Sequence, residues 1–194
     1  MNSLPPELDS LIIELACESS FGVYTTRAIS RTSTYFHDIA APFRFHTLAV
    51  STQKQAAHLI PLLKTIPAHK RHIRRLFLGP DLGLAPASLL RLLHLAAPTL
   101  RDLALVLTHS TSTALLGAVF RARLPHLKAL VVRGFYPLPP PGAFPALTHL
   151  HLAGNRAPAG VPAALARACP GLTHLRVSGL SCAPAFAREL RDAV

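Results

Sequence analysis

The sequence predicts an α/β fold in which a short N-terminal helical segment, residues 1–44, is followed by an array of parallel strands with helices on its convex side, residues 45–194. Two observations predict this organisation: a leucine pattern that recurs along the second part, and a change in charge near residue 50. Half of the 194 residues are hydrophobic and 15% are charged. A chain of this composition can bury a sizeable core and is not expected to be disordered.

The recurring pattern is L-x-x-L-x-L, with conservative replacements, and it occurs five times after residue 70. In a strand the two leucines of the L-x-L step point to the same face. A single strand cannot bury them, whereas several strands stacked side by side build a continuous core. The central leucines are separated by 27, 27, 20 and 25 residues, and residues 45–50 fit a degenerate first strand. These leucines are Leu76, Leu103, Leu130, Leu150 and Leu175.

The segments between the predicted strands complete each unit. Residues 87–97, 113–122 and 162–168 are expected to be helical, and a final helix is expected around Phe186 and Leu190. Residues 134–142 are rich in proline, which predicts a loop or a polyproline stretch in place of a helix. The pattern resembles leucine-rich repeats of the irregular, helical sort, and this resemblance implies a small solenoid of about five to six units.

The first fifty residues predict two helices. Leu4-Pro-Pro-Glu-Leu8 is typical of a helix start, because proline fits the first turn and Glu7 is favoured by the helix dipole there. A second helix is predicted from about residue 25 to residue 41, where Pro42 ends it. The first helix carries an apolar stripe at helical spacing. The residues of this predicted stripe are Leu8, Leu11, Ile12, Leu15 and Ala16.

This segment resembles an F-box. The resemblance rests on Leu4-Pro-Pro-Glu-Leu8, Ile12-Ile13, Ile29-Ser-Arg31, Tyr35-Phe36 and Ile39-Ala-Ala-Pro42, although the stretch between Ile29 and Phe36 is longer than in the best-known members. It implies a substrate-recognition adaptor of a cullin–RING (SCF-type) ubiquitin ligase, in which the F-box docks on a Skp-type adaptor and the repeats bind a protein substrate. The alternative is that these residues are core positions of a helical cap. The implied docking residues are Leu4, Pro5, Leu8, Ile12, Ile13 and Ile29.

The concave face of the predicted array is the natural binding surface, and the residues that flank the inward leucines should point to it. Aligned strands would place His149 beside His174, and His151 beside Arg176. The later strands then form a polar, basic patch, which we expect to bind an acidic or phosphorylated protein segment. A solvated face without a dedicated ligand is the alternative. The candidate substrate-binding residues are Arg75, Phe77, Arg133, His149, His151, His174 and Arg176.

Two further functions stay open, and one of them rests on charge. Residues 1–50 hold three Arg and five acidic residues, a net charge of −2, whereas residues 51–194 carry a net charge of +13. The positive charge of residues 51–194 would suit a nucleic-acid-binding protein, and the basic run at 68–75 would suit a phosphate contact or a nuclear localisation signal. Aromatic residues for base stacking are few, however, and Trp is absent. A solvated loop is the simpler interpretation of the basic run. The other open function is a leucine-rich-repeat scaffold that binds protein without recruiting a ligase.

Catalysis, cofactors and metals are not expected. Gly-rich phosphate loops, a G-x-S-x-G elbow and an H-E-x-x-H pair are absent from the sequence. His149, His151 and His174 on adjacent strands are a possible but poorly supported metal set. Three widely spaced cysteines, Cys17, Cys169 and Cys182, predict buried thiols. The acidic N-terminus and the lack of a membrane-length apolar run predict an intracellular protein of the cytoplasm or nucleus.

Overall fold

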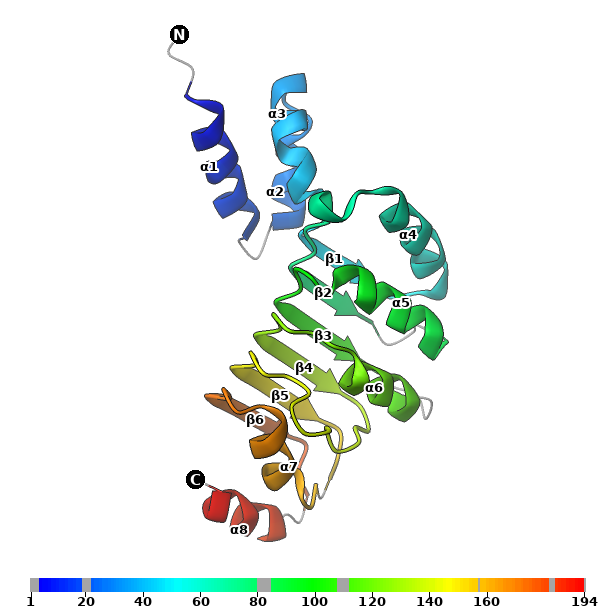
Figure 1. The fold of residues 1–194 in the computed structure, drawn as a ribbon, viewed down its shortest axis with the longest axis vertical. Helices are drawn as coiled ribbons and strands as arrows, with labels where there is room; N and C mark the ends of the chain where they lie inside the picture. The colour runs from blue at the N-terminus through cyan, green and yellow to red at the C-terminus, as the bar shows by residue number, and fades with distance from the viewer. Residues whose placement is uncertain are drawn as a thin grey trace.

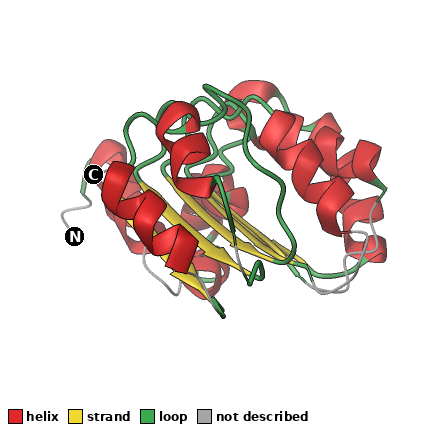
Figure 2. Cartoon of the chain, turned by 90° about the horizontal axis from the view of Figure 1, so that it is seen from below, coloured by secondary structure: helices red, strands yellow, loops and turns green. Residues whose placement is uncertain are grey.

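The structure is a computed structural model, and it describes residues 4–18, 22–79, 85–107, 112–156, 158–181 and 184–193. Within these residues the fold is α/β, with a six-stranded, all-parallel sheet whose strands follow one another in chain order (Figure 1). In the view of Figure 2 the strands overlap, as expected for a sheet that extends in one direction. The strands are β1 (Thr47–Val50), β2 (Arg75–Leu78), β3 (Asp102–Val106), β4 (Ala129–Arg133), β5 (His149–Ala153) and β6 (His174–Ser178).

The register of the sheet aligns the central leucine of every repeat. Leu76 pairs with Leu103, and the same row continues through the other predicted central leucines. Leu48 adds a sixth member, which confirms the degenerate first strand. Because a slip of one residue would turn every leucine to solvent, the L-x-L step itself fixes this register.

Helices follow most of the strands. Figure 1 shows α4, α5 and α6 side by side along the sheet, and the pairs α4–α5, α5–α6 and α7–α8 are in contact. The four predicted helices are present, and α4 is a further helix that was not among those predicted. A loop with several prolines, residues 134–148, joins β4 to β5 as predicted. The helices are α4 (Gln53–Thr65), α5 (Pro86–Ala96), α6 (Ser112–Arg121), α7 (Val161–Ala168) and α8 (Pro184–Ala193), with a short 3-10 helix, η2, at Ala68–Lys70.

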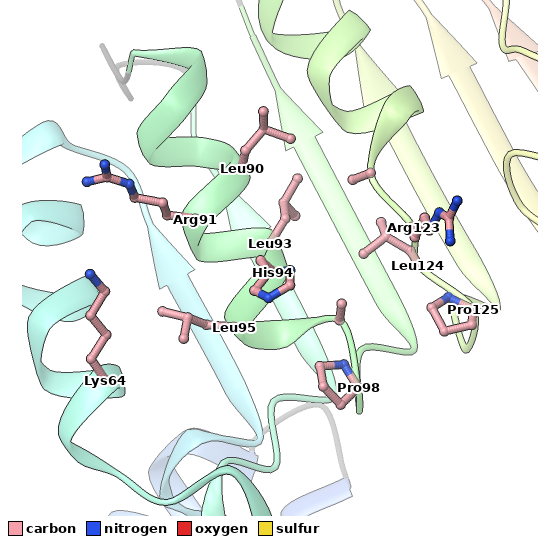
Figure 3. A pocket seen from close by; sticks show the side chains of 12 residues that line it. Lys64, Leu90, Arg91, Leu93, His94, Leu95, Pro98, Arg123, Leu124 and Pro125 are labelled. Carbon is pink, nitrogen blue, oxygen red and sulfur yellow. The ribbon is translucent and has the colours of Figure 1, made fainter.

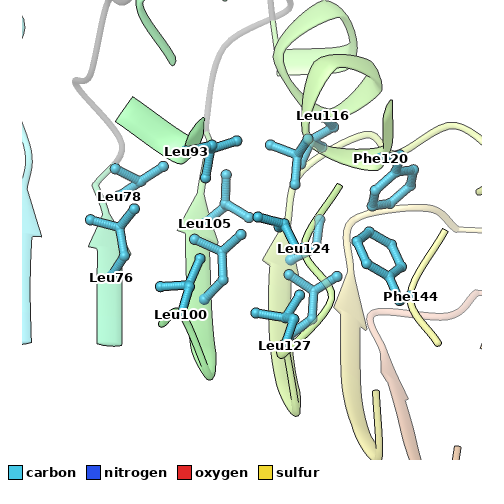
Figure 4. Packing of buried hydrophobic residues seen from close by; sticks show 14 of the residues in the cluster. Leu76, Leu78, Leu93, Leu100, Leu105, Leu116, Phe120, Leu124, Leu127 and Phe144 are labelled. Atoms are coloured by element: carbon cyan, nitrogen blue, oxygen red, sulfur yellow. The ribbon is translucent and has the colours of Figure 1, made fainter. Parts of the chain in front are cut away.

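The main core lies between the sheet and these helices, where leucines from both sides interdigitate (Figure 4). Leu103 and Leu105 of β3 are 1% and 0% exposed. Phe144, from the loop between β4 and β5, packs edge-on against Phe120 of α6, with ring centroids 5.8 Å apart. Phe144 therefore fills the core position that a helix residue supplies in the neighbouring units, which is why a proline-rich loop can replace a helix there.

The predicted second helix is wrong, because the structure has two helices in its place. These are α2 (Gly22–Ile29) and α3 (Thr34–Ala40), and a 3-10 helix, η1 (Ala41–Phe45), follows at Pro42. The Ser30 and Thr32 hydroxyls donate to the carbonyls of Arg27 and Ile29, at 3.0 and 2.7 Å. Ser33 then caps α3 by accepting the Phe36 N–H. Hydroxyl side chains compete with helical backbone bonds in this way, so the run ends one helix and starts the next.

The N-terminal helical unit, defined as α1 (Pro6–Glu18), α2, α3 and η1, has a small core of its own. Its buried residues are Ile13, Cys17, Ala40 and Phe43. The Cys17 thiol lies 2.8 Å from the Thr26 hydroxyl. Figure 1 shows the unit beyond the β1 end of the sheet, and an ion pair between Glu14 and Arg74 joins α1 to the residue before β2.

The cysteines behave as buried thiols where they are described. Cys17 and Cys169 are free and buried, as predicted, while Cys182 lies outside the described residues. Burial raises the pKa of the Cys169 thiol to about 11. Among the described helices, none has both the length and the apolar character that crossing a bilayer requires.

Candidate functional site

A row of large aliphatic side chains, on α1 and at Leu4 just before it, is exposed to solvent. We call Leu4, Leu8, Leu11, Ile12 and Leu15 the apolar stripe. Their exposed fractions lie between 46% and 61%. Ile13 and Cys17, on the opposite side of the same helix, fill the small core instead. Helix α1 is thus apolar on two sides, and only one of them is used inside the chain. Exposed clusters of this kind often mark interaction sites.

The predicted docking residues divide between the surface and the core. Leu4, Pro5, Leu8 and Ile12 are exposed. Ile13 is 3% exposed, so the prediction that it belongs to an accessible docking face is corrected. Adjacent residues of a helix point about 100° apart, so when Ile12 points outward, Ile13 points toward the small core. Ile29 is partly buried and packs against the small core, so it supports the unit from within.

Leu11 and Leu15 are surface residues that the implied docking set left out. Their signal in the sequence was their helical spacing from Leu8, and the predicted stripe already contained both residues. Tyr35 of α3 holds α1 in place by donating a 2.8 Å hydrogen bond to the Asp9 carboxylate. That bond to a carboxylate raises the pKa of Tyr35.

The second candidate surface is the open face of the sheet, defined as the outward-pointing residues between the buried leucines. On β4 and β5, buried residues alternate with more exposed ones, as the L-x-L step predicts. His149 is paired with His174 and His151 with Arg176, as predicted. The His149 and His174 rings stack with centroids 4.3 Å apart and planes 4° apart. The hydroxyls of Thr148 and Thr173 lie 2.9 and 2.8 Å from the Nδ1 atoms of the following histidines, which fixes both rings.

These histidines border a shallow hollow of about 460 Å³ over β4–β6. His151 lies 2.9 Å from the Ser178 hydroxyl through Nε2. Burial and the neighbouring Arg176 lower the pKa of His151, so its ring is neutral at neutral pH. The hollow can therefore offer the neutral imidazole of His151 and the permanent cation of Arg176 to a ligand. Four of the seven predicted substrate residues line it, namely His149, His151, His174 and Arg176.

The other three predicted substrate residues lie apart from this hollow. Arg75 of β2 pairs with Asp102 of β3, at 3.2 Å between Nε and Oδ2. Phe77 is 40% exposed on the same part of the open face. Arg133 is exposed at the end of β4 and does not line the hollow. The seven residues share one face of the sheet but do not form a single site.

A further hollow, larger than the one over β4–β6, lies on the helix side of the sheet (Figure 3). It has a volume of about 740 Å³, between the C-terminal ends of α5 and α6, and its walls are mainly apolar. Figure 3 shows Leu90 and Leu93 of α5 and Leu124 after α6 pointing toward it, with Lys64 and Arg91 at its side. A helix was predicted at residues 87–97, but a surface hollow beside it was not. Leucine on more than one side of α5 was the signal, because a half-buried helix needs only one apolar stripe.

Neither surface contains the parts of a metal centre, because no group of three or more His, Cys, Asp or Glu side chains that could hold a metal occurs in the described part of the chain. The three-imidazole alternative has no support there. Comparison of the chain with protein family models, with curated proteins and with solved structures finds no match.

Proposed function

We propose that this protein is a substrate-recognition adaptor of a cullin–RING ubiquitin ligase. In this proposal the N-terminal helical unit is an F-box that docks on a Skp-type adaptor. The sheet and its helices form a small leucine-rich-repeat solenoid whose open face binds a protein substrate. The observation that carries the proposal is the exposure of the apolar stripe on α1, together with the resemblance of residues 4–42 to an F-box.

The contact between α1 and the sheet supports docking over a purely structural role. A helix that served only to cap the repeats would bury its apolar side against β1. Helix α1 instead meets the sheet through the charged pair of Glu14 and Arg74, and its stripe points elsewhere. Five exposed aliphatic side chains in one row are enough for a hot spot, in which a few residues each contribute about 2 kcal/mol or more to binding.

The repeat architecture supports the second half of the proposal. Parallel strands in chain order, one central leucine per strand and a spacing of 20–28 residues are all typical of leucine-rich repeats. The positive charge of residues 51–194 favours a substrate segment that is acidic or phosphorylated.

The decisive experiment is co-purification of the whole chain with a Skp-type adaptor. We expect the parent to bind and the double variant Leu8→Asp, Ile12→Asp to lose binding while its circular dichroism spectrum is unchanged. Leu62→Asp is the matched control, because Leu62 is an exposed leucine, 50% accessible, on helix α4. It should bind as the parent does. A folded parent that fails to bind would reject ligase recruitment and leave a repeat scaffold as the function.

A further inference from the structure

A small polar hollow of about 140 Å³ lies where the N-terminal helical unit meets the edge at which the strands begin. It is separate from the apolar stripe and from the hollow over β4–β6. Four of its lining side chains are cationic, and only one is acidic. The lining residues are Cys17, His46, Thr47, Arg74, Arg75, Arg101, Asp102 and Lys128.

The repeat itself builds a row of cations along this edge. Arg74, Arg101 and Lys128 hold the same position in three successive units, directly after the first apolar residue of L-x-x-L-x-L. The Arg74 carbonyl accepts the N–H groups of Arg101 and Asp102, and the carbonyls of Arg101 and Lys128 accept the corresponding pairs from the next units. Neighbouring backbones are therefore fixed about 4.8 Å apart. Thr148 and Thr173 replace the cation in the later units, so the row is confined to the end near α1.

The cations of this hollow differ in their partners. Arg74 pairs with Glu14, and Arg75 pairs with Asp102 at 3.2 Å. For Arg101 and Lys128, no carboxylate lies within ion-pair distance in the described part of the chain. Arg101 and Lys128 are therefore two adjacent, exposed cations without such a carboxylate. An anion with two negative charges would neutralise both.

His46 supplies an uncharged polar wall to the same hollow. The residue is 4% exposed, and its Nδ1 has no hydrogen-bond partner among the described residues. Burial, followed by the nearby charge of Arg74, lowers the pKa of His46 to about 4, so the ring is neutral at neutral pH. Its carbonyl accepts the N–H groups of Arg74 and Arg75, at 3.0 and 2.8 Å, which fixes it to the start of β2. Its ring packs edge-on against Phe43, with centroids 4.9 Å apart, so this wall of the hollow is held in a fixed position.

We infer that this hollow binds a phosphate monoester carried by a phosphorylated side chain of a protein partner. A water molecule takes about 30 Å³ in the liquid, so the hollow has room for about five water-sized groups. This volume suits one phosphate. A phosphate monoester carries close to two negative charges at neutral pH, which matches Arg101 and Lys128, and arginine can bind two of its oxygens at once.

A nucleic acid fits these observations less well. A backbone phosphodiester carries one charge, and no Phe, Tyr or Trp lines the hollow to stack on a base. The site takes one isolated group rather than an extended strand. Only the choice of a protein partner rests on the proposed function. The phosphate site itself does not depend on ligase recruitment.

The test is a titration of the whole chain, followed by NMR and calorimetry, with inorganic phosphate and with a five-residue peptide that has a central phosphoserine. The unphosphorylated peptide and a short single-stranded oligonucleotide are the comparison ligands. The site variant is Arg101→Gln, Lys128→Gln. The matched control is Lys54→Gln, Arg167→Gln, which removes two exposed cations on helices α4 and α7, outside both candidate binding surfaces. We expect phosphate and the phosphopeptide to bind the parent and the control alike, and the site variant about tenfold or more weakly.

Three results would overturn the inference. A folded parent that binds neither phosphate nor the phosphopeptide has no such site. A site variant that binds no more weakly than the control variant would mean general attraction to a basic surface rather than a site at Arg101 and Lys128. Tighter binding of the oligonucleotide through Arg101 and Lys128 would replace the protein partner with a nucleic acid.

The same variants separate this inference from the proposed function. The site variant leaves the apolar stripe intact, so it should co-purify with a Skp-type adaptor as the parent does. A parent that binds the adaptor but neither phosphate nor the phosphopeptide would reject the phosphate site alone. Phosphate binding by a chain that ignores the adaptor would reject ligase recruitment alone.

Discussion

His149 and His174, one on each of two neighbouring strands, stack their rings almost parallel, with centroids 4.3 Å apart. They are paired in register across β5 and β6, and a threonine hydroxyl before each one holds its Nδ1. The pair is therefore a built feature of the open face rather than two independent surface histidines.

We expect the two rings to stabilise each other. In a double-mutant cycle of His149→Ala and His174→Ala, urea unfolding should give a coupling energy of about 0.5–1 kcal/mol, as is usual for paired rings. The cycle of His149→Ala with His58→Ala, an exposed histidine on α4, is the control and should be additive. A coupling energy indistinguishable from that control would show that the stack contributes nothing to stability.

Leu103 should be among the residues most sensitive to truncation. It is 1% exposed at the centre of the leucine row, and Leu103→Ala should lower the free energy of unfolding by about 2–5 kcal/mol. Leu62→Ala removes the same atoms from an exposed helix position and should change it by less than about 1 kcal/mol. Chemical denaturation measures both, and similar values for the two would contradict the assigned core.

Two glycines should respond to alanine in opposite directions. Gly154 has a φ of +128°, and a Cβ there would collide with the carbonyl of Gly134, so Gly154→Ala should destabilise the protein by more than about 1 kcal/mol. Gly117 lies within α6, where a Cβ meets only the end of the Arg121 side chain at 4.0 Å. Gly117→Ala should stabilise by about 0.5–1 kcal/mol. Thermal unfolding of both variants checks the signs, and a neutral Gly154→Ala would contradict the close approach of the two loops.

His46 should make the protein sensitive to mild acid. Its pKa falls from 6.5 when unfolded to about 4 in the folded protein, first because of burial and then because of Arg74. Between these values the unfolded chain binds the additional proton, so stability is present above pH 6.5 and declines as the pH drops toward 4. The full effect is on the order of 3 kcal/mol. Unfolding free energies of the parent and His46→Phe, measured from pH 7 to pH 4, should differ in slope.

Exposed His69 provides the control for this comparison, and His69→Phe should keep the slope of the parent. If His46→Phe and the parent lose stability in parallel over this range, then another group causes the acid sensitivity and the burial of His46 is not its source.

Features that are set by residues close together in the chain could be predicted from the sequence. The L-x-L step fixes both the strand and its register, and so the pairing of His151 with Arg176 followed directly. Helix α4 was missed because Pro61 lies inside it, although the capping box of Thr52 and Gln55 was a readable start signal.

Features that depend on packing could not be predicted in this way. Whether Ile12 or Ile13 faces outward depends on which side of α1 meets α3, and a family pattern treats the two as a pair. The hollow beside Leu90 depends on the sideways distance between α5 and α6, which no motif encodes. The cationic row from Arg74 to Lys128 was present in the sequence as three equivalent positions, but only the fold brings His46 to it.

Strand order has a consequence for how the protein folds. Because each strand pairs only with the strands nearest to it in the chain, the sheet is assembled from contacts between segments 20–28 residues apart. Contacts of this range lower the entropy cost of loop closure, and stability then adds up from one unit to the next. A local opening at β6 would therefore leave the hydrogen bonds of β1 and β2 protected, and amide exchange should be graded along the length of the molecule rather than uniform.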